Sequence, residues 1–178
     1  HYLAEHGGFD YWSHQPNRNV GGVASSANGL LSKLEPTEVL DHPLPGRIKG
    51  RGVLLARFGG GDDGLTVAIA HLSLGANSRK AQLAYIAELL SQYPHAVLMG
   101  DFNCPWDVPE MDVLFRHTRL RPPVRPVLTF PSWGPERAID HILVSEGMDY
   151  RNVHAVRAAR SDHLALALEL QVPPRALR

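Results

Sequence analysis

The sequence predicts an α/β or α+β protein, and two features of its pattern lead to this class. Short apolar, β-branched segments alternate with clusters of glycine and proline, while a single long segment has helical periodicity. One strand-like segment, residues 96–99, is apolar at every position, which is typical of a central strand covered on both faces. At 178 residues the chain has the size of one domain, and we expect residues 1–178 to form one.

The composition excludes several classes of protein. A hydrophobic fraction of 44% with 20% charged residues rules out a disordered or collagen-like chain. The longest apolar runs span only a few residues, whereas a membrane helix needs about 20, so no integral membrane segment is expected. The one cysteine, Cys104, excludes an intrachain disulfide and a multi-cysteine zinc site, and a lone thiol is compatible with the cytoplasm.

The first third of the chain shows little regular pattern. Residues 1–29 have weak periodicity, and Asn28-Gly29 is a strong turn signal. The prolines and glycines of residues 36–52 predict a loop. The first strand is therefore expected at residues 53–58, which are apolar except for one arginine.

A hairpin and a helix are expected next. The glycine-rich residues 59–64 connect the first strand to a second one at residues 66–71. Residues 79–92 have the period of a helix, which Ser78 can cap. Its apolar face consists of Leu83, Ile86, Leu90 and Tyr93.

The second half of the chain continues with strands around a long loop. Residues 96–99 form the central strand. Seven prolines between residues 105 and 135 predict a loop with one helical turn near residues 110–116. A strand follows at residues 138–144, and alternating leucines predict another at residues 164–170.

Polar side chains stand at the ends of these predicted strands. In open α/β sheets, ligands bind beyond the strand ends, where loops from several strands converge. We therefore expect a site there, and its candidate residues are His71, Asp101, Asn103, Asp140, Asp162 and His163.

Asp101 and Asn103 are two residues apart, so they would point to the same side of an extended segment. A carboxylate takes up a proton and an amide donates a hydrogen bond, and together these groups suit a water molecule or a phosphate. The alternative is a simple turn after a buried strand, because aspartate and asparagine both favour turns.

Asp140 lies among apolar residues, where a carboxylate is costly to bury unless it is paired. A histidine would solve this problem, and an Asp–His pair fixes the tautomer of the imidazole and raises its basicity. Asp162 beside His163 offers a metal-binding carboxylate next to an imidazole. The alternatives are an edge position in water for Asp140 and a purely structural role for His163.

Taken together, the motifs resemble those of the endonuclease/exonuclease/phosphatase superfamily of metal-dependent phosphoesterases. The similar region runs from about residue 25 to residue 170. The stretches that carry the resemblance are Asn28–Ser32, His71-Leu72 with Arg79 and Gln82, Val97–Asn103, Thr129–Trp133, Ile139–Ser145 and Ser161–His163.

This resemblance implies a four-layer α/β sandwich, in which two packed mixed sheets are flanked by helices. It also implies hydrolysis of a phosphoester or phosphodiester by attack of water, with Mg²⁺ or Mn²⁺ neutralising charge. His71 would stabilise negative charge developing on the phosphate, and Asn103 would hold the phosphate.

The resemblance assigns the remaining roles to acidic residues and one histidine. Asp101 would position or deprotonate the attacking water, and Asp101 and Asp162 would bind the metal. Asp140 would orient His163, which would contact the scissile phosphate or act as an acid or base.

Two groups of the family have no match here: an asparagine of an early strand and a metal-binding glutamate. We therefore expect the chain to lack the N-terminal part of such a domain, roughly 60 residues including its first strands. Metal binding would then be weaker, and a homodimer could cover the apolar sheet edge left exposed. The alternative function is accordingly a catalytically impaired fragment that keeps the scaffold and binds phosphate without turnover.

The substrate could be a nucleic acid, a phospholipid headgroup or a small phosphoester. The balance of 18 basic and 18 acidic residues is not that of a protein specialised for long nucleic acids. Four arginines within ten residues could nevertheless grip phosphates, or form an ordinary solvated surface. These arginines are Arg116, Arg119, Arg121 and Arg125.

Other polar and aromatic residues near the motifs are expected to be structural. Trp106 and Trp133 flank the proline-bearing loop and are expected to pack beneath it; the alternative is that they stack on a base or contact lipid. Arg79 and Gln82 would tie the helix to the loop after His71. Cys104 is expected to be structural rather than a nucleophile, and His141 would pack beside the site.

Overall fold

The computed structural model describes residues 2–20, 23–46, 50–61, 63–123, 125–157, 161–172 and 174–177. The elements follow in this order: α1 (Tyr2–Gly7), β1 (Tyr11–Val20), β2 (Val23–Ser32), β3 (Glu38–Pro43), β4 (Gly52–Phe58), β5 (Leu65–His71), α2 (Ala76–Leu90), β6 (His95–Asp101), the 3-10 helix η1 (Pro109–Met111), α3 (Asp112–His117), β7 (Leu120–Arg121), β8 (Asp140–Ser145), β9 (Tyr150–Val156), β10 (Ala165–Leu170) and the 3-10 helix η2 (Pro174–Leu177).

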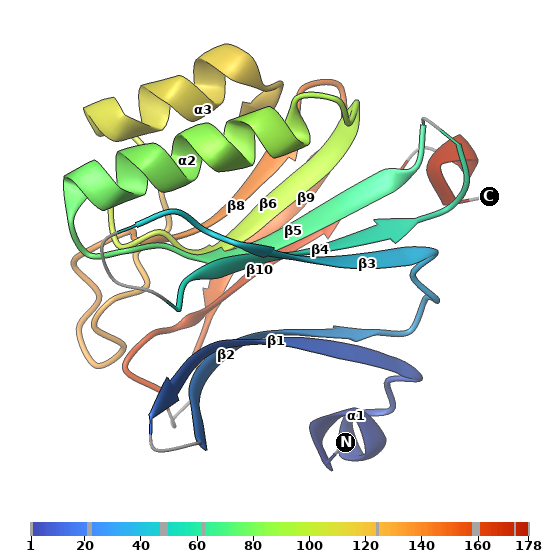
Figure 1. Ribbon diagram of the computed structural model, residues 1–178, viewed down its shortest axis with the longest axis horizontal. Coiled ribbons are helices and arrows are strands. Elements are labelled where there is room, and N and C mark those ends of the chain that lie inside the picture. The colour runs from blue at the N-terminus through green and yellow to red at the C-terminus, as the bar shows by residue number, and fades with distance from the viewer. Residues whose placement is uncertain are drawn as a thin grey trace.

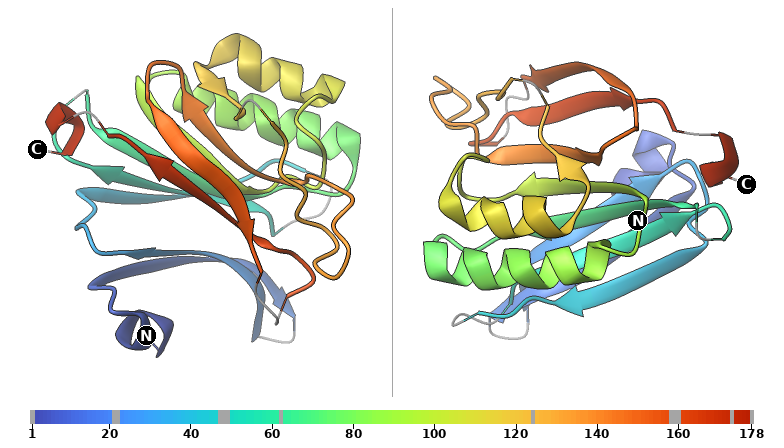
Figure 2. Two further views of the ribbon diagram at one scale, coloured as in Figure 1. Left: turned by 180° about the vertical axis from the view of Figure 1, so that it is seen from behind. Right: turned by 90° about the horizontal axis from the view of Figure 1, so that it is seen from above.

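A six-stranded mixed sheet forms the centre of the fold, with the strand order β3-β4-β5-β6-β8-β7. Strands β5 and β6 run parallel because α2 connects them, whereas the other neighbours are antiparallel. Helices α2 and α3 cover one face of the sheet, and the hairpins β1–β2 and β9–β10 lie on the other (Figures 1 and 2). Helix α1 lies on the side of the β1–β2 hairpin that faces away from the central sheet (Figure 1). The predicted α/β sandwich of packed sheets is therefore confirmed, with few helices.

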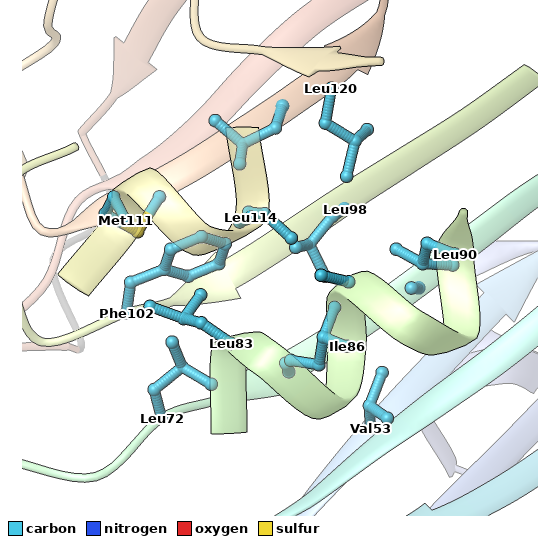
Figure 3. Packing of buried hydrophobic residues seen from close by; sticks show 14 of the residues in the cluster. Val53, Leu72, Leu83, Ile86, Leu90, Leu98, Phe102, Met111, Leu114 and Leu120 are labelled. Atoms are coloured by element: carbon cyan, nitrogen blue, oxygen red, sulfur yellow. The ribbon is translucent and has the colours of Figure 1, made fainter. Parts of the chain in front are cut away.

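Each face of the central sheet has its own hydrophobic core, because successive side chains of a strand point to opposite faces. In β4, Leu55 packs into the core under the helices and Leu54 into the core under the hairpins. Figure 3 shows the helix-side core, where α2 buries Leu83, Ile86 and Leu90 against the sheet. The apolar helical face predicted from the sequence is thus the one that packs.

The helix itself begins earlier than predicted. It starts at Ala76 rather than at residue 79, and its N-cap is Gly75, which makes no side-chain capping bond. Ser78 is therefore inside the first turn rather than the cap. The backbone N–H of Arg79 donates to the Gly75 carbonyl oxygen and closes that turn.

The largest departure from the predicted elements is the N-terminal region, which forms α1 and the β1–β2 hairpin. Asn28-Gly29 is not a turn but lies inside β2. The Asn28 side-chain amide donates to Gln15 Oε1 at 2.9 Å and to the Gly52 carbonyl at 2.8 Å. These buried hydrogen bonds fasten the hairpin to the central sheet, and this tertiary contact overrides the local turn preference.

Three further strands were not predicted: β3, β9 and the two-residue β7, which lies in the stretch expected to be a loop. The residues expected to form a loop over 36–52 include β3, an edge strand whose side chains are half-exposed or exposed. Strand β9 also carries alternating exposed residues, so neither strand has a strong apolar signal. Within the described ranges, no helix has both the length and the apolar composition needed to cross a bilayer.

Candidate active site

The register of the central sheet brings three of the predicted residues into one row. Strand β5 ends at His71, β6 ends at Asp101, and β8 begins at Asp140. His71 is the register partner of Asp101 in the β5–β6 ladder, and Asp101 is the register partner of Asp140 in the β6–β8 ladder. Because neighbouring strands are about 4.8 Å apart, the three side chains are held close together at one end of the sheet, where these strands end or begin.

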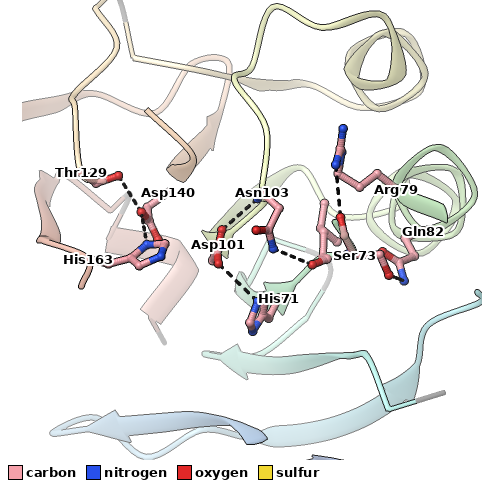
Figure 4. Close-up of polar contacts among 10 residues, drawn as sticks. His71, Ser73, Arg79, Gln82, Asp101, Asn103, Thr129, Asp140 and His163 are labelled. Carbon is pink, nitrogen blue, oxygen red and sulfur yellow. Dashed lines mark hydrogen bonds and ion pairs between the residues drawn. The ribbon is translucent and has the colours of Figure 1, made fainter. Parts of the chain in front are cut away.

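Asp140 is paired with His163, as expected for a carboxylate among apolar neighbours. His163 Nδ1 donates to Asp140 Oδ2 at 2.8 Å (Figure 4). The side chain of Asp140 is 18% exposed, and β8 lies between β6 and β7. Asp140 is therefore not at a water-facing edge. Since Nδ1 is occupied, the other ring nitrogen of His163, Nε2, is the one available to a ligand.

The surroundings of His163 favour its charged form. Burial acts to lower the pKa of His163, but the hydrogen bond and charge of Asp140, with the charges of Asp101 and Asp162, raise the pKa above its ordinary value. The side chain remains 25% exposed, so it stays reachable from solvent. This imidazole can donate a proton at a higher pH than a free histidine can.

A second imidazole–carboxylate pair lies beside the first. His71 Nε2 is 3.3 Å from Asp101 Oδ2, and the backbone N–H of Asn103 donates to Asp101 Oδ1 at 2.8 Å. Burial acts to raise the pKa of Asp101, but the bonds from His71 and Asn103 and the charges of His71 and His163 lower the pKa below its ordinary value. Asp101 is therefore an anion at neutral pH.

Asn103 lies in a bend after β6, so the expectation of an extended segment at Asn103 is wrong. Its φ of 56° is in the left-handed region, which asparagine tolerates better than most residues. Its side-chain Nδ2 donates to the Leu72 carbonyl at 2.9 Å, next to His71 (Figure 4). The bend places Asn103 beside Asp101 by folding the chain back, not by alternation along a strand.

One cluster in the described part of the chain has ligand atoms close enough to hold a metal ion: Asp101, Asp140 and His163, with atoms within 4.8 Å of one another. Carboxylate oxygens suit hard cations such as Mg²⁺ and Mn²⁺. Asp140 is the least available of the three, because its Oδ2 already accepts two hydrogen bonds. Asp162 is not in this described cluster; its side chain is exposed and its backbone carbonyl accepts from Ser132.

Arg79 and Gln82 hold the loop after His71, as expected. The guanidinium of Arg79 donates to the carbonyls of Ser73 and Leu74, and the Gln82 amide bonds both the backbone N–H and the hydroxyl of Ser73. Figure 4 shows this attachment of α2 to the loop. Glu110, which the sequence did not point to, accepts from Arg79 in a pair whose side chains are only 10% and 11% exposed.

Thr129 is the residue of this site that sequence reasoning missed. Its hydroxyl donates to Asp140 Oδ2 at 2.6 Å, and the ring of the adjacent Phe130 is 4.8 Å from that of His163. The resemblance included the stretch 129–133 without assigning it a role. A threonine in a proline-bearing loop has no pattern of its own, and the family motif was the one available signal.

Two other polar residues are structural, as expected. Cys104 is buried, and burial raises the pKa of its thiol to about 11, so it is a poor nucleophile. His141 is also buried, and its Nε2 bonds the Cys104 carbonyl at 2.8 Å. Burial lowers the pKa of His141, so this histidine is neutral at neutral pH.

Two of the four clustered arginines, Arg116 and Arg121, form ion pairs away from the site. Arg116 pairs with Asp112 on the surface of α3. Arg121 pairs with Glu146, and its register partner Val144 is at the opposite end of β8 from Asp140. The two tryptophans also differ: Trp106 packs partly buried against the helix-side core, whereas Trp133 is 80% exposed. The expectation that Trp133 packs beneath the loop is therefore wrong.

Residues 1–163 match the sequence profile of the Endonuclease/Exonuclease/phosphatase family. The chain belongs to this family. The match includes all the site residues described above, from His71 to His163. No curated protein sequence matches the chain.

Solved structures show the same fold at low sequence identity. A conserved protein of unknown function from Enterococcus faecalis V583 superposes with a TM-score of 0.75 and 18% identity, over 92% of this chain and 77% of that one. The mannosyl-6-phosphatase Bt3783 of Bacteroides thetaiotaomicron VPI-5482 has a TM-score of 0.68 and 18% identity, over 90% and 77%. A mutant of beta toxin from Staphylococcus aureus, solved with bound magnesium ions, has a TM-score of 0.63 and 14% identity, over 92% and 78%.

Proposed function

We propose that this family member is a metal-dependent hydrolase that cleaves a phosphoester bond by attack of water. The observation that carries the proposal is the pair of imidazole–carboxylate contacts, His71–Asp101 and His163–Asp140, side by side at one end of the sheet. Such a site offers one anionic acceptor for a proton and two donors for phosphate oxygens. All four side chains are partly exposed, so a substrate can reach them.

The reaction divides between the two pairs. Asp101, held as an anion, orients a water molecule and takes up its proton as the water oxygen bonds to phosphorus. The bond from phosphorus to the leaving oxygen breaks, and His163, whose charged form is favoured, gives that oxygen a proton. His71 and Asn103 would contact the other phosphate oxygens.

Mg²⁺ or Mn²⁺, when bound, neutralises phosphate charge and lowers the pKa of a bound water. The donor set fits such a cation in chemistry, because Asp101 presents carboxylate oxygens beside a second carboxylate and an imidazole within 4.8 Å. Asp101 would hold the ion; Asp162, the other metal-binding carboxylate expected from the sequence, is not in this described cluster. A bound-magnesium structure exists for the similar beta toxin mutant, which supports this choice of cation.

The alternative is a site that binds phosphate without turnover. It is favoured by the small number of oxygen donors in the described cluster, two carboxylates, where Mg²⁺ takes six ligands and usually keeps several waters. In that case His71 and His163 would still bind a phosphate dianion by charge-assisted hydrogen bonds.

Hydrolysis of bis(p-nitrophenyl) phosphate, followed in Mg²⁺, in Mn²⁺ and in a chelator, tests the proposal. We expect metal-dependent release of p-nitrophenol that falls at least about 100-fold in Asp101→Ala and in His163→Ala. The matched control is His154→Ala, because His154 is an exposed histidine of β9 whose ring bonds the carbonyl of Asn152. It should retain full activity.

The opposite outcome identifies the alternative. Activity that survives both site variants would place hydrolysis elsewhere. If no phosphoester is cleaved but inorganic phosphate binds in calorimetry, and His163→Ala abolishes that binding, the chain is a phosphate-binding member of the family.

A further inference from the structure

We propose that Thr129 is a positioning residue of the hydrolytic site, whose hydroxyl fixes the Asp140 carboxylate and through it the imidazole of His163. The inference rests on the proposed function. It adds a third member to the pair that the sequence indicated and explains why a polar side chain is buried in the loop before β8.

The geometry is that of two donors on one oxygen atom. Thr129 Oγ1 donates to Asp140 Oδ2 at 2.6 Å, and His163 Nδ1 donates to the same oxygen at 2.8 Å. Figure 4 shows the three side chains in a row, with Asp140 between the other two. If the carboxylate rotated about its terminal torsion, both bonds would break, so the hydroxyl holds Asp140 in the orientation that serves His163.

Thr129 is itself held rigidly. Its side chain is fully buried, and as a β-branched residue it has restricted rotamers. Its backbone N–H donates to the Arg137 carbonyl at 2.9 Å, and its carbonyl accepts from the N–H of Leu164 at 2.8 Å. The hydroxyl is therefore held in one orientation. Leu164, the residue after His163, is hydrogen-bonded to the same threonine.

The residues after Thr129 hold the His163 segment from its other side. The Phe130 ring lies 4.8 Å from the His163 ring, the Ser132 N–H donates to the Asp162 carbonyl at 2.7 Å, and the Ser132 hydroxyl donates to the Ser161 carbonyl at 2.6 Å. The backbone is thus fixed independently of the Thr129 hydroxyl. Removal of that hydroxyl alone should release the carboxylate and leave the loop in place.

The two hydrogen bonds to Oδ2 also give Asp140 a different role from that of Asp101. With both acceptor positions of Oδ2 used by Thr129 and His163, this oxygen is committed to orienting the imidazole rather than to a cation. In the proposed hydrolysis His163 acts on the leaving oxygen, whereas His71 and Asn103, on the other side of Asp101, would contact the other phosphate oxygens. Loss of the hydroxyl should therefore lower kcat and leave KM nearly unchanged.

The test compares Thr129→Val, which keeps the shape of the side chain, with Thr129→Ser, which keeps the hydroxyl. With bis(p-nitrophenyl) phosphate and Mn²⁺, we expect kcat to fall about 10-fold in Thr129→Val with KM within twofold, and Thr129→Ser to retain most of kcat. The matched control is Thr66→Val, because Thr66 is buried in β5 and its hydroxyl has no partner among the described residues. It should keep kcat.

A second readout does not depend on turnover. Nitrogen-15 NMR of the imidazole, recorded at a pH above the pKa of His163 so that the ring is neutral, should show the Nδ1–H tautomer in the wild-type chain and in Thr129→Ser, and a mixture of tautomers in Thr129→Val. If the chain hydrolyses nothing, the proposed function fails while this tautomer shift still supports the positioning role. Wild-type kcat and tautomer in Thr129→Val, or a Thr129→Ser variant as impaired as Thr129→Val, would overturn the inference.

Discussion

Asp101 and Asp140 are directly opposite each other in the antiparallel β6–β8 ladder. Two like charges in this position would destabilise a sheet if they stood alone. Each carboxylate instead has its own imidazole: His71 at 3.3 Å from Asp101, and His163 at 2.8 Å from Asp140. The fold can therefore keep two carboxylates at neighbouring strand ends because two histidines are supplied by β5 and by the loop before β10.

The first prediction concerns the titration of His163. Because the carboxylates outweigh burial, the pKa of His163 should lie above its ordinary value of 6.5. Asp140→Asn removes the charge and should lower the pKa of His163, since burial is then less opposed. Carbon-13 NMR of the imidazole as a function of pH measures both midpoints, and an unchanged midpoint in Asp140→Asn would contradict the assignment.

The second prediction concerns the pH dependence of stability, which follows from the raised pKa of His163. A histidine whose pKa is raised on folding stabilises the protein below its unfolded pKa, and this contribution disappears as the pH rises through the folded pKa. The wild-type chain should therefore lose its stability advantage over His163→Gln as the pH is raised from about 6 to about 8. Urea unfolding at several pH values gives the comparison.

Asp101 should show the reverse pH dependence. Its pKa is lowered from 3.8 on folding, so its contribution to stability is present above the unfolded pKa and is lost as the pH falls through the folded pKa. Relative to Asp101→Asn, the wild-type chain should lose stability between about pH 5 and pH 3. Acid unfolding of both chains, monitored by circular dichroism, measures this loss. A difference in stability between the wild-type chain and Asp101→Asn that does not change with pH would contradict the prediction.

Gly100 is required by the close approach of β5 and β6 just before Asp101. It has a φ of 137°, and a Cβ built there would lie 1.9 Å from the Ala70 carbonyl oxygen. Gly100→Ala should lower the free energy of unfolding by about 3 kcal/mol or more, since it combines backbone strain with overpacking. Gly134→Ala is the control, because nothing lies within 4 Å of a Cβ there, and it should change stability by less than about 0.5 kcal/mol.

The sequence allowed the central sheet to be predicted better than the hairpins. Mostly apolar runs identified β4, β5, β6 and β8, the inner strands of the central sheet, because strands covered on both faces are rich in apolar side chains, whereas the edge strands β3 and β7 were not predicted. The β1–β2 hairpin buries Gln15 and Asn28, which satisfy each other by a hydrogen bond. Composition alone makes such residues resemble a loop, because the partner that permits burial is distant in the sequence.

The site was predictable to the same extent. The polar residues at strand ends could be found because they interrupt apolar runs, and the pairing of Asp140 with a histidine followed from the cost of a buried charge. The row from His71 to Asp140 depends on strand order, which no local pattern specifies. Thr129 could not be found by pattern, because its role exists only through one hydrogen bond to Asp140.

The last prediction concerns the buried ion pair that holds the loop after His71. Arg79 Nε donates to Glu110 Oε1 at 3.0 Å, and both side chains are about nine-tenths buried. Arg79→Ala should lower the free energy of unfolding by about 3 kcal/mol, because it leaves the Glu110 carboxylate buried without its partner.

The matched control is Arg116→Ala, which breaks an ion pair of the same type on the surface of α3. The Arg116 and Asp112 side chains are 73% and 59% exposed, so solvent screens their attraction and the loss should stay below about 0.5 kcal/mol. Urea unfolding of the two variants measures the difference. Equal small losses of stability would mean that the Arg79–Glu110 pair is solvated in solution. A large loss in Arg79→Ala alone is the expected result. If Arg79→Ala also has a lower affinity for phosphate, the ion pair helps to keep His71 in position.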